Sequence, residues 1–204
     1  EEFQAKAHQA HDHGHEFDIL QYVQTHAATL HQLFAVPGGT PHGSGKGNVV
    51  LEVSATPYLY SLRFYDWLRR DEQGTLRPVH VDHAFANLQR DHVGPKVAED
   101  LIRPPVRLRG GDGWVEEELS SLPEVFFEVR RFTVDPGATA ADDTAGRFHI
   151  LNVVAGEGVV IETDRGDTHD LAYAETIVIP AAVGGYRLRA EGDQPVMVVK
   201  AQVR

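Results

Sequence analysis

The sequence predicts a mostly β protein in which short helical segments accompany one or more sheets of the sandwich or barrel type. The first observation is that apolar residues alternate with polar ones in run after run of the second half. The second is that Gly, Asp and Pro turns separate these runs, at a spacing typical of sandwiches and barrels. The third is that 204 residues, 42% of them hydrophobic, can bury a sizeable core in one large or two small domains.

In chain order, the first part of the sequence mixes helix and strand. Residues 1 to about 30 are rich in Ala, Gln, Lys and Glu, and residues 17–26 space their apolar side chains as a helix does, with Asp18 as a possible cap. The β-branched run at 49–53 predicts a strand with a buried glutamate, and the alternation at 58–64 predicts a second strand. Further weak helices are expected in HVDHAFANLQRDHVG and VAEDLIRPP.

From residue 125 to the end almost every segment is predicted to be a strand. The alternating runs are VFFEVRRFTV, FHILNVV, GVVIET, TIVIP, YRLRA and VMVVKAQV. The intervening turns are DPG, AGEG, DRGD, AAVGG and AEGDQP, and GGDG at 110–113 forms another turn ahead of them.

Charge and cysteine content restrict the function. The net charge of −11 argues against nucleic-acid or anionic-membrane partners, although local arginines can still bind a small anionic substrate. No apolar run reaches the length of a membrane helix, and the first residues lack the apolar centre of a signal peptide, so we expect a cytoplasmic protein. With no cysteine, a metal would need His, carboxylate or amide ligands. The sequence leaves the oligomeric state open.

A histidine on a glycine-rich turn is the main chemical feature of the first half. Residues 37–42 read P-G-G-T-P-H, which fits the pattern P-x-G-x-x-H. Pro37 fixes its own φ, Gly39 permits a positive φ, and His42 follows on a rigid backbone. A metal ligand requires such rigidity together with an open side for substrate.

This pattern resembles the second motif of the cupins, small β-barrels that often hold a metal. The longer run VPGGTPHGSGKGNVVLEVSATPYLYSLRFYDWLR resembles the type I phosphomannose isomerases, and the similarity extends through LRPVHVDHAFANL, FHILNVVAGEG and AYAETIVIPAAVGGYRL. The resemblance implies cupin-like double-stranded β-helix barrels. Residues 1–105 would form the closing part of a catalytic barrel with flanking helices, and residues 106–204 a second barrel without metal.

The resemblance also implies an activity, the zinc-dependent interconversion of mannose 6-phosphate and fructose 6-phosphate. His42 matches a zinc ligand, Glu52 an active-site acid, and Arg63 an arginine that assists proton transfer. Such an isomerisation moves a proton through an enediol, which needs a base and a cation near the developing oxyanion. His80 is a further acid/base candidate. Read without the resemblance, Glu52 is also compatible with an outward-facing strand residue, and Arg63 with a partner of Asp66 or Tyr65.

The remaining zinc ligands of this family, a Gln-x-His pair and a glutamate, lie well upstream of the last histidine. Gln9-Ala10-His11 spells Gln-x-His within a polar, His-rich segment, and we interpret that match as chance. His11 and His15 would share one helix face, but a solvated segment is the simpler interpretation. We therefore expect this chain to be the C-terminal part of a longer isomerase-like protein.

Two other functions remain open. The chain could be a non-catalytic cupin domain for sugar binding or assembly, which the absence of a histidine in Pro180–Tyr186 of the second barrel favours. A metal-dependent cupin of other chemistry, a dioxygenase or epimerase, would need a His-x-His pair. His11 and His13 have that spacing, but they lie in the segment predicted to be helical.

Overall fold

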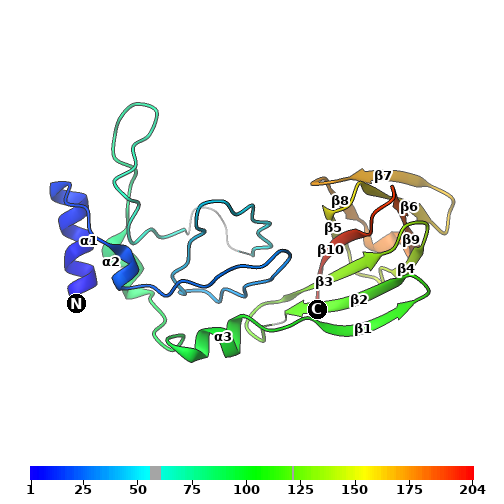
Figure 1. Cartoon of the computed structure of the whole chain (residues 1–204), viewed down its shortest axis with the longest axis horizontal. Coiled ribbons are helices and arrows are strands. Elements are labelled where there is room, and N and C mark those ends of the chain that lie inside the picture. The colour runs from blue at the N-terminus through cyan, green and yellow to red at the C-terminus, as the bar shows by residue number, and fades with distance from the viewer. Residues whose placement is uncertain (56–60, 121) are drawn as a thin grey trace. The chain divides into compact units, whose positions relative to one another are not determined.

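The computed structural model describes residues 1–55, 61–120 and 122–204. The chain divides into two compact units (Figure 1). Unit 1 comprises Glu1–Leu30 and Val36–Leu101, and unit 2 comprises His31–Ala35 and Ile102–Arg204. None of the helices in the described ranges is long and apolar enough to cross a membrane.

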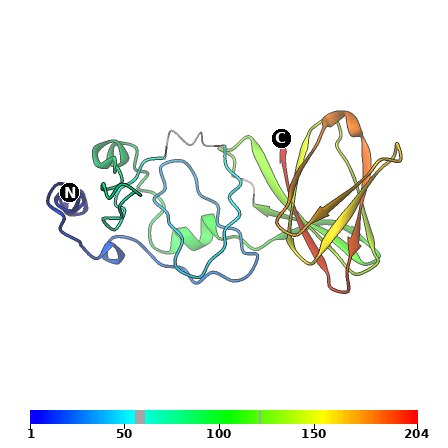
Figure 2. The same cartoon turned by 90° about the horizontal axis from the view of Figure 1, so that it is seen from above.

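Unit 2 is made of two antiparallel sheets that curve around a common interior (Figure 2). The six-stranded sheet has the order β1-β2-β3-β10-β5-β8, and the four-stranded sheet has the order β4-β9-β6-β7. The strands are β1 Val106–Gly111, β2 Trp114–Ser120, β3 Phe127–Val134, β4 Thr139–Asp143, β5 His149–Ala155, β6 Gly158–Thr163, β7 Thr168–Ala172, β8 Thr176–Ile179, β9 Gly185–Glu191 and β10 Val196–Val203. The predicted mostly β class and the predicted strands of the second half are confirmed.

The alternation seen in the sequence becomes the division between interior and surface. In β9, Tyr186, Leu188 and Ala190 are buried, whereas the residues between them are exposed. Their ladder partners in β6 place Ile161 opposite Leu188, so that the apolar sides of the two strands coincide. The fully buried core continues across both sheets through Phe132, Val134, Leu151, Val153, Val159, Val196 and Val198.

Glycines lie in the turns between these strands, as the sequence predicts. Gly156, between β5 and β6, has a φ of +81°, and a Cβ placed there would lie 2.7 Å from Val196 Cγ2 and 2.9 Å from the Pro195 carbonyl oxygen. Gly137, between β3 and β4, also has a positive φ of +73°, but a Cβ there would meet no atom within 4 Å.

Unit 1 contains short helices and an aromatic cluster. The helices are α1 Glu2–His13, the 3-10 turn η1 Ile19–Gln21, α2 Val81–Ala86 and α3 Pro95–Leu101. Phe3 of α1 lies 4.9 Å from Tyr22, 5.9 Å from Phe64 and 5.0 Å from Phe85, measured between ring centroids. The cluster therefore joins α1, α2 and the intervening chain.

The expected helices of unit 1 are confirmed in part. Helix α1 is present, and the Asp18 side chain caps the next turn by accepting a hydrogen bond of 3.0 Å from the Leu20 amide. Only Ile19–Gln21 of the expected helix at 17–26 is helical, because Phe17 and Tyr22 turn their rings into the aromatic cluster. Helix α1 ends where Gly14 adopts a left-handed conformation, so His11 and His15 do not share a helix face.

The predicted strand at 49–53 is wrong. These residues are coil, and Val49 and Val50 are 97% and 64% exposed. A β-branched run forms a strand only when another strand pairs with it, and no described residue does so here. The predicted strand at 58–64 lies partly outside the described residues, and its described part, 61–64, is not a strand.

Substitution at the two glycine turns tests how tightly β5, β6 and β10 pack. We expect Gly137→Ala to lower the free energy of unfolding by about 1 kcal/mol, the cost of a left-handed alanine. Gly156→Ala should cost about 1–3 kcal/mol more, because its methyl group must displace Val196 or the backbone. Urea unfolding in a Trp67→Phe background, followed by the fluorescence of Trp114, measures both, and equal losses would contradict this packing.

Candidate functional site

His42 lies on the turn that its sequence pattern predicts. The Thr40 amide donates a 3.1 Å hydrogen bond to the Pro37 carbonyl, and Gly39 has the expected positive φ, +78°. A Cβ on Gly39 would lie 2.5 Å from the Asn87 carbonyl oxygen, so this position requires glycine. His42 itself is exposed, and its Nδ1 lies 3.0 Å from the Thr40 carbonyl oxygen. Its ring is thus available to solvent on a well-defined turn.

Glu52 does not lie where the sequence predicts. It was expected to be a buried strand residue, but it is exposed in a coil segment. The reason is the same as for the absence of a strand at 49–53. Because no described strand pairs with this segment, neither of its faces is buried. Its alternative interpretation, an outward-facing strand residue, agrees with the exposure of Glu52 but not with the coil conformation of the segment.

Arg63 is half-buried and is held by its neighbours in space. Its backbone amide donates to His80 Nδ1 at 3.3 Å, and the His80 amide donates to the Arg63 carbonyl at 2.8 Å. Its guanidinium donates to the Pro78 carbonyl at 3.4 Å. Since His80 Nδ1 accepts a backbone hydrogen bond, His80 fixes the position of Arg63, which sequence reasoning did not anticipate.

Asp66, the expected alternative partner of Arg63, pairs with other arginines. Its carboxylate contacts Arg69, and it lies 3.2 Å from Arg77 Nε. Both partners belong to the same loop region. The Arg63 guanidinium is therefore not neutralised by this carboxylate.

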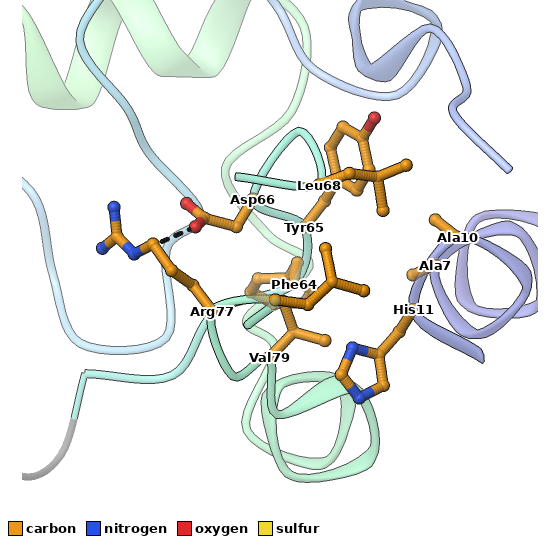
Figure 3. A pocket seen from close by; sticks show the side chains of 10 residues that line it. Ala7, Ala10, His11, Phe64, Tyr65, Asp66, Leu68, Arg77 and Val79 are labelled. Carbon is orange, nitrogen blue, oxygen red and sulfur yellow. Dashed lines mark ion pairs between the residues drawn. The ribbon is translucent and has the colours of Figure 1, made fainter. Parts of the chain in front are cut away.

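A small pocket lies beside this region in unit 1 (Figure 3). Ala7, Ala10 and His11 of α1 face it from one side, and residues from Phe64 to Val79 face it from the other. Its inner volume of about 10 Å³ is at the lower limit for one water molecule. The pocket is too small for a sugar phosphate.

The described residues gather no group of three or more His, Asp or Glu side chains that could hold a metal. Nor does a hydrogen bond or ion pair in these parts of the chain join His42, Glu52 and Arg63. Among the histidines of α1, His8 Nε2 instead lies 2.9 Å from Asp82 Oδ1 and helps to tie α1 to α2. In the part of the chain that the structure describes, the three predicted site residues therefore do not interact with one another.

A group of buried charged side chains lies inside unit 2. Lys200 of β10 is 1% exposed and Glu116 of β2 is 0% exposed. The Lys200 Nζ lies 2.8 Å from Glu116 Oε1 and 2.5 Å from Asp142 Oδ2 of β4. We call Lys200, Glu116 and Asp142 the charged centre. It joins strands from both sheets.

A hydrogen-bond relay extends the charged centre to β5 and β9. The Tyr186 hydroxyl donates to Asp142 Oδ2 at 2.8 Å, and His149 Nδ1 lies 2.8 Å from the same hydroxyl oxygen. Because the Tyr186 proton goes to Asp142, His149 must donate from Nδ1 to the tyrosine oxygen. The relay therefore assigns the Nδ1–H form to His149.

Arg109 closes the charged centre toward the surface. Its guanidinium donates to Glu116 Oε2 and to Asp142 Oδ1, each at 2.5 Å, and it lies 5.4 Å from the ring centre of Trp114. Arg109 belongs to β1 at the edge of one sheet, and Asp142 belongs to β4 at the edge of the other. A single side chain thus links the two edges.

The electrostatics of this group follow from burial and from Lys200. Burial acts to raise the pKa of Asp142, but the charge and hydrogen bond of Lys200 outweigh it and hold that pKa below its usual value. Burial, and then the charge of Lys200, lower the pKa of His149. Burial, followed by Asp142, raises the pKa of Tyr186. At neutral pH the relay contains a carboxylate, a neutral tyrosine and a neutral imidazole.

The sequence analysis predicted a second barrel without metal and did not predict the charged centre. One signal was visible: Lys200 interrupts the apolar run VMVV–AQV, and a lysine is rarely buried without a partner. The identity of its partners was not visible, because Glu116 and Asp142 belong to other strands.

The lowered pKa of His149 predicts a pH dependence of stability. An unfolded histidine has a pKa near 6.5, so below that pH the unfolded chain binds a proton that the folded chain resists. The contribution of His149 to the free energy of unfolding is complete above this pH. It decreases as the pH falls below it, by up to about 1.4 kcal/mol per pH unit. We expect His149→Asn to reduce the change of the free energy of unfolding with pH between neutral and mildly acidic conditions, as measured by urea titration. The exposed His169 provides the control, and a slope lost equally in His169→Asn would contradict the assignment.

Comparison with known proteins agrees with the resemblance drawn from the sequence. No protein-family model matches the chain. Mannose-6-phosphate isomerase ManA of Bacillus subtilis is 24% identical over 169 residues, which are 78% of this chain and 46% of that protein. Mannose-6-phosphate isomerase of Streptococcus mutans is 28% identical over 163 residues, which are 78% of this chain and 45% of that protein. The chain thus spans about half the length of the curated relatives it matches.

The structural comparison concerns the fold. The crystal structure of mannose 6-phosphate isomerase from Bacillus subtilis superposes with a TM-score of 0.54 at 17% identity, over 68% of this chain and 39% of that one. The fold is therefore cupin-like, and the sequence resembles those of the mannose-6-phosphate isomerases.

Proposed function

We propose that the chain contributes to a sugar-phosphate isomerase that interconverts mannose 6-phosphate and fructose 6-phosphate. The observation that carries the proposal is the similarity over 78% of this chain to isomerases with that name. The cupin-like fold supports it. Because the chain spans about half of those relatives, we propose that a longer isomerase-like protein completes the active site.

In the proposed reaction, a base takes a proton from one carbon and returns it to the next. Glu52 is the proposed base, since it is a solvent-accessible carboxylate. Arg63 is the proposed cation that stabilises the enediolate oxygen. Its backbone is fixed by His80, which limits the reorganisation needed when charge develops. His80 is then a positioning residue rather than an acid or base.

The part of the chain that the structure describes does not by itself accommodate the proposed zinc ion. A catalytic zinc takes three protein ligands, and His42 supplies one. The described residues provide no group of three, so they do not fit a complete zinc site. We therefore assign His42 as one proposed ligand and derive no step through the metal.

The second candidate function is a non-catalytic cupin domain that binds sugar or serves assembly. The exposure of Glu52 and the absence, in the described residues, of interactions joining it to His42 or Arg63 favour this alternative. The two functions differ in one respect that can be measured, namely turnover as opposed to binding of mannose 6-phosphate.

Arg63 provides the test. In the longer isomerase-like protein supplied with zinc, a coupled assay should detect fructose 6-phosphate formed from mannose 6-phosphate, and Arg63→Met should lower kcat/KM by about 10²-fold, the usual loss for one oxyanion-stabilising group. The exposed Arg90 supplies the matched control, and Arg90→Met should leave kcat/KM unchanged. Calorimetry with mannose 6-phosphate runs alongside. Binding without turnover would support the non-catalytic alternative, and neither binding nor turnover would refute both.

A further inference from the structure

The ammonium group of Lys200 occupies an unusual place for a lysine. It lies in the middle of β10, where every residue from Val198 to Gln202 is buried. Moving an ammonium ion out of water costs several kcal/mol unless opposite charges compensate it. Here two carboxylates provide that compensation, and the ammonium also lies 4.9 Å from the ring centre of Phe132.

The two carboxylates reach the same point from opposite sheets. Glu116 comes from β2 of the six-stranded sheet, and Asp142 comes from β4 of the four-stranded sheet. Their oxygens converge on Lys200 Nζ at 2.8 and 2.5 Å. Each carboxylate uses its other oxygen to accept from Arg109, so both are already oriented.

The contact between Lys200 and Glu116 is electrostatic rather than directional. Glu116 Oε1 is fully buried and has no well-aligned hydrogen-bond donor, even though the ammonium lies 2.8 Å away and Arg130 Nη1 lies 3.5 Å away. A buried carboxylate oxygen therefore points into the centre without a directed partner. A spherical cation would satisfy it as well as an ammonium does.

We propose that Lys200 is a built-in cation in the interior of unit 2, placed where a divalent metal ion would bind between Glu116 and Asp142. Unit 2 then needs no metal ion, and replacing Lys200 with a shorter residue turns the charged centre into a site for a divalent cation. Oxygen ligands favour ions such as Mn²⁺ and Mg²⁺. Such ions bind oxygen at about 2.0–2.2 Å, so the carboxylates need to close by only about 0.5 Å around the vacated position.

The experiment uses the full chain with Trp67→Phe, which leaves Trp114 as the reporter of unit 2. Mn²⁺ binding is measured by the loss of the free-ion electron paramagnetic resonance signal. Unfolding is measured by the fluorescence of Trp114. We expect Lys200→Ala to take up one Mn²⁺ more per chain than the parent, and Mn²⁺ to raise its melting temperature by several degrees. In the parent, neither Mn²⁺ nor a chelator should shift the melting temperature.

The matched control is Lys200→Ala combined with Asp142→Asn, which removes one carboxylate from the same centre and should abolish the additional Mn²⁺ binding. If Lys200→Ala folds only when Mn²⁺ is present, the proposal is supported directly. Lys200→Ala that binds no more Mn²⁺ than the parent would overturn it, as would a variant that stays unfolded in millimolar Mn²⁺. A parent protein that a chelator destabilises would also overturn it.

Discussion

The structure of unit 2 depends on one buried charge and its compensation. Lys200 is 1% exposed, and only the carboxylates of Glu116 and Asp142 make that burial tolerable. These residues come from β10, β2 and β4, so the compensation exists only when both sheets have closed in the correct register. A slip of one residue along β10 would turn the ammonium away from its partners and leave buried charges unpaired. The charged centre therefore favours a single closed arrangement of the sheets.

The sequence predicts unit 2 well, because what determines its strands is local. Alternation within each strand and Gly or Asp at each turn are properties of neighbouring residues, whereas the pairing of β10 with β3 and of β4 with β9 joins strands far apart in the sequence. The strand predicted at 49–53 fails because its formation depends on a partner that no local pattern reports. The charged centre was not predicted for a similar reason. Glu116, Asp142 and Lys200 meet through the topology of two sheets, and the sequence shows only that a lysine interrupts an apolar run.

Unit 1 carries the residues proposed for isomerisation, and the fold holds some of them in place more firmly than others. The turn before His42 has the predicted geometry, with Gly39 in a position that excludes a side chain. Arg63 is fixed through His80 in a way that no motif indicated. Glu52 lies in an exposed coil, where nothing orients its carboxylate toward the other two. The difference between these residues is consistent with the proposal that a longer protein completes the site. It is equally consistent with a domain that only binds sugar.

The most direct test of the account is nuclear magnetic resonance of the Lys200 ammonium in uniformly ¹⁵N-labelled protein. The account predicts a distinct Nζ–H signal at neutral pH, protected from exchange with water and shifted upfield by the Phe132 ring, 4.9 Å away. Lys46, which is exposed, serves as the internal reference. An ammonium signal of Lys200 with the shift and exchange rate of Lys46 would show that it is solvated, and the charged centre would not exist as described.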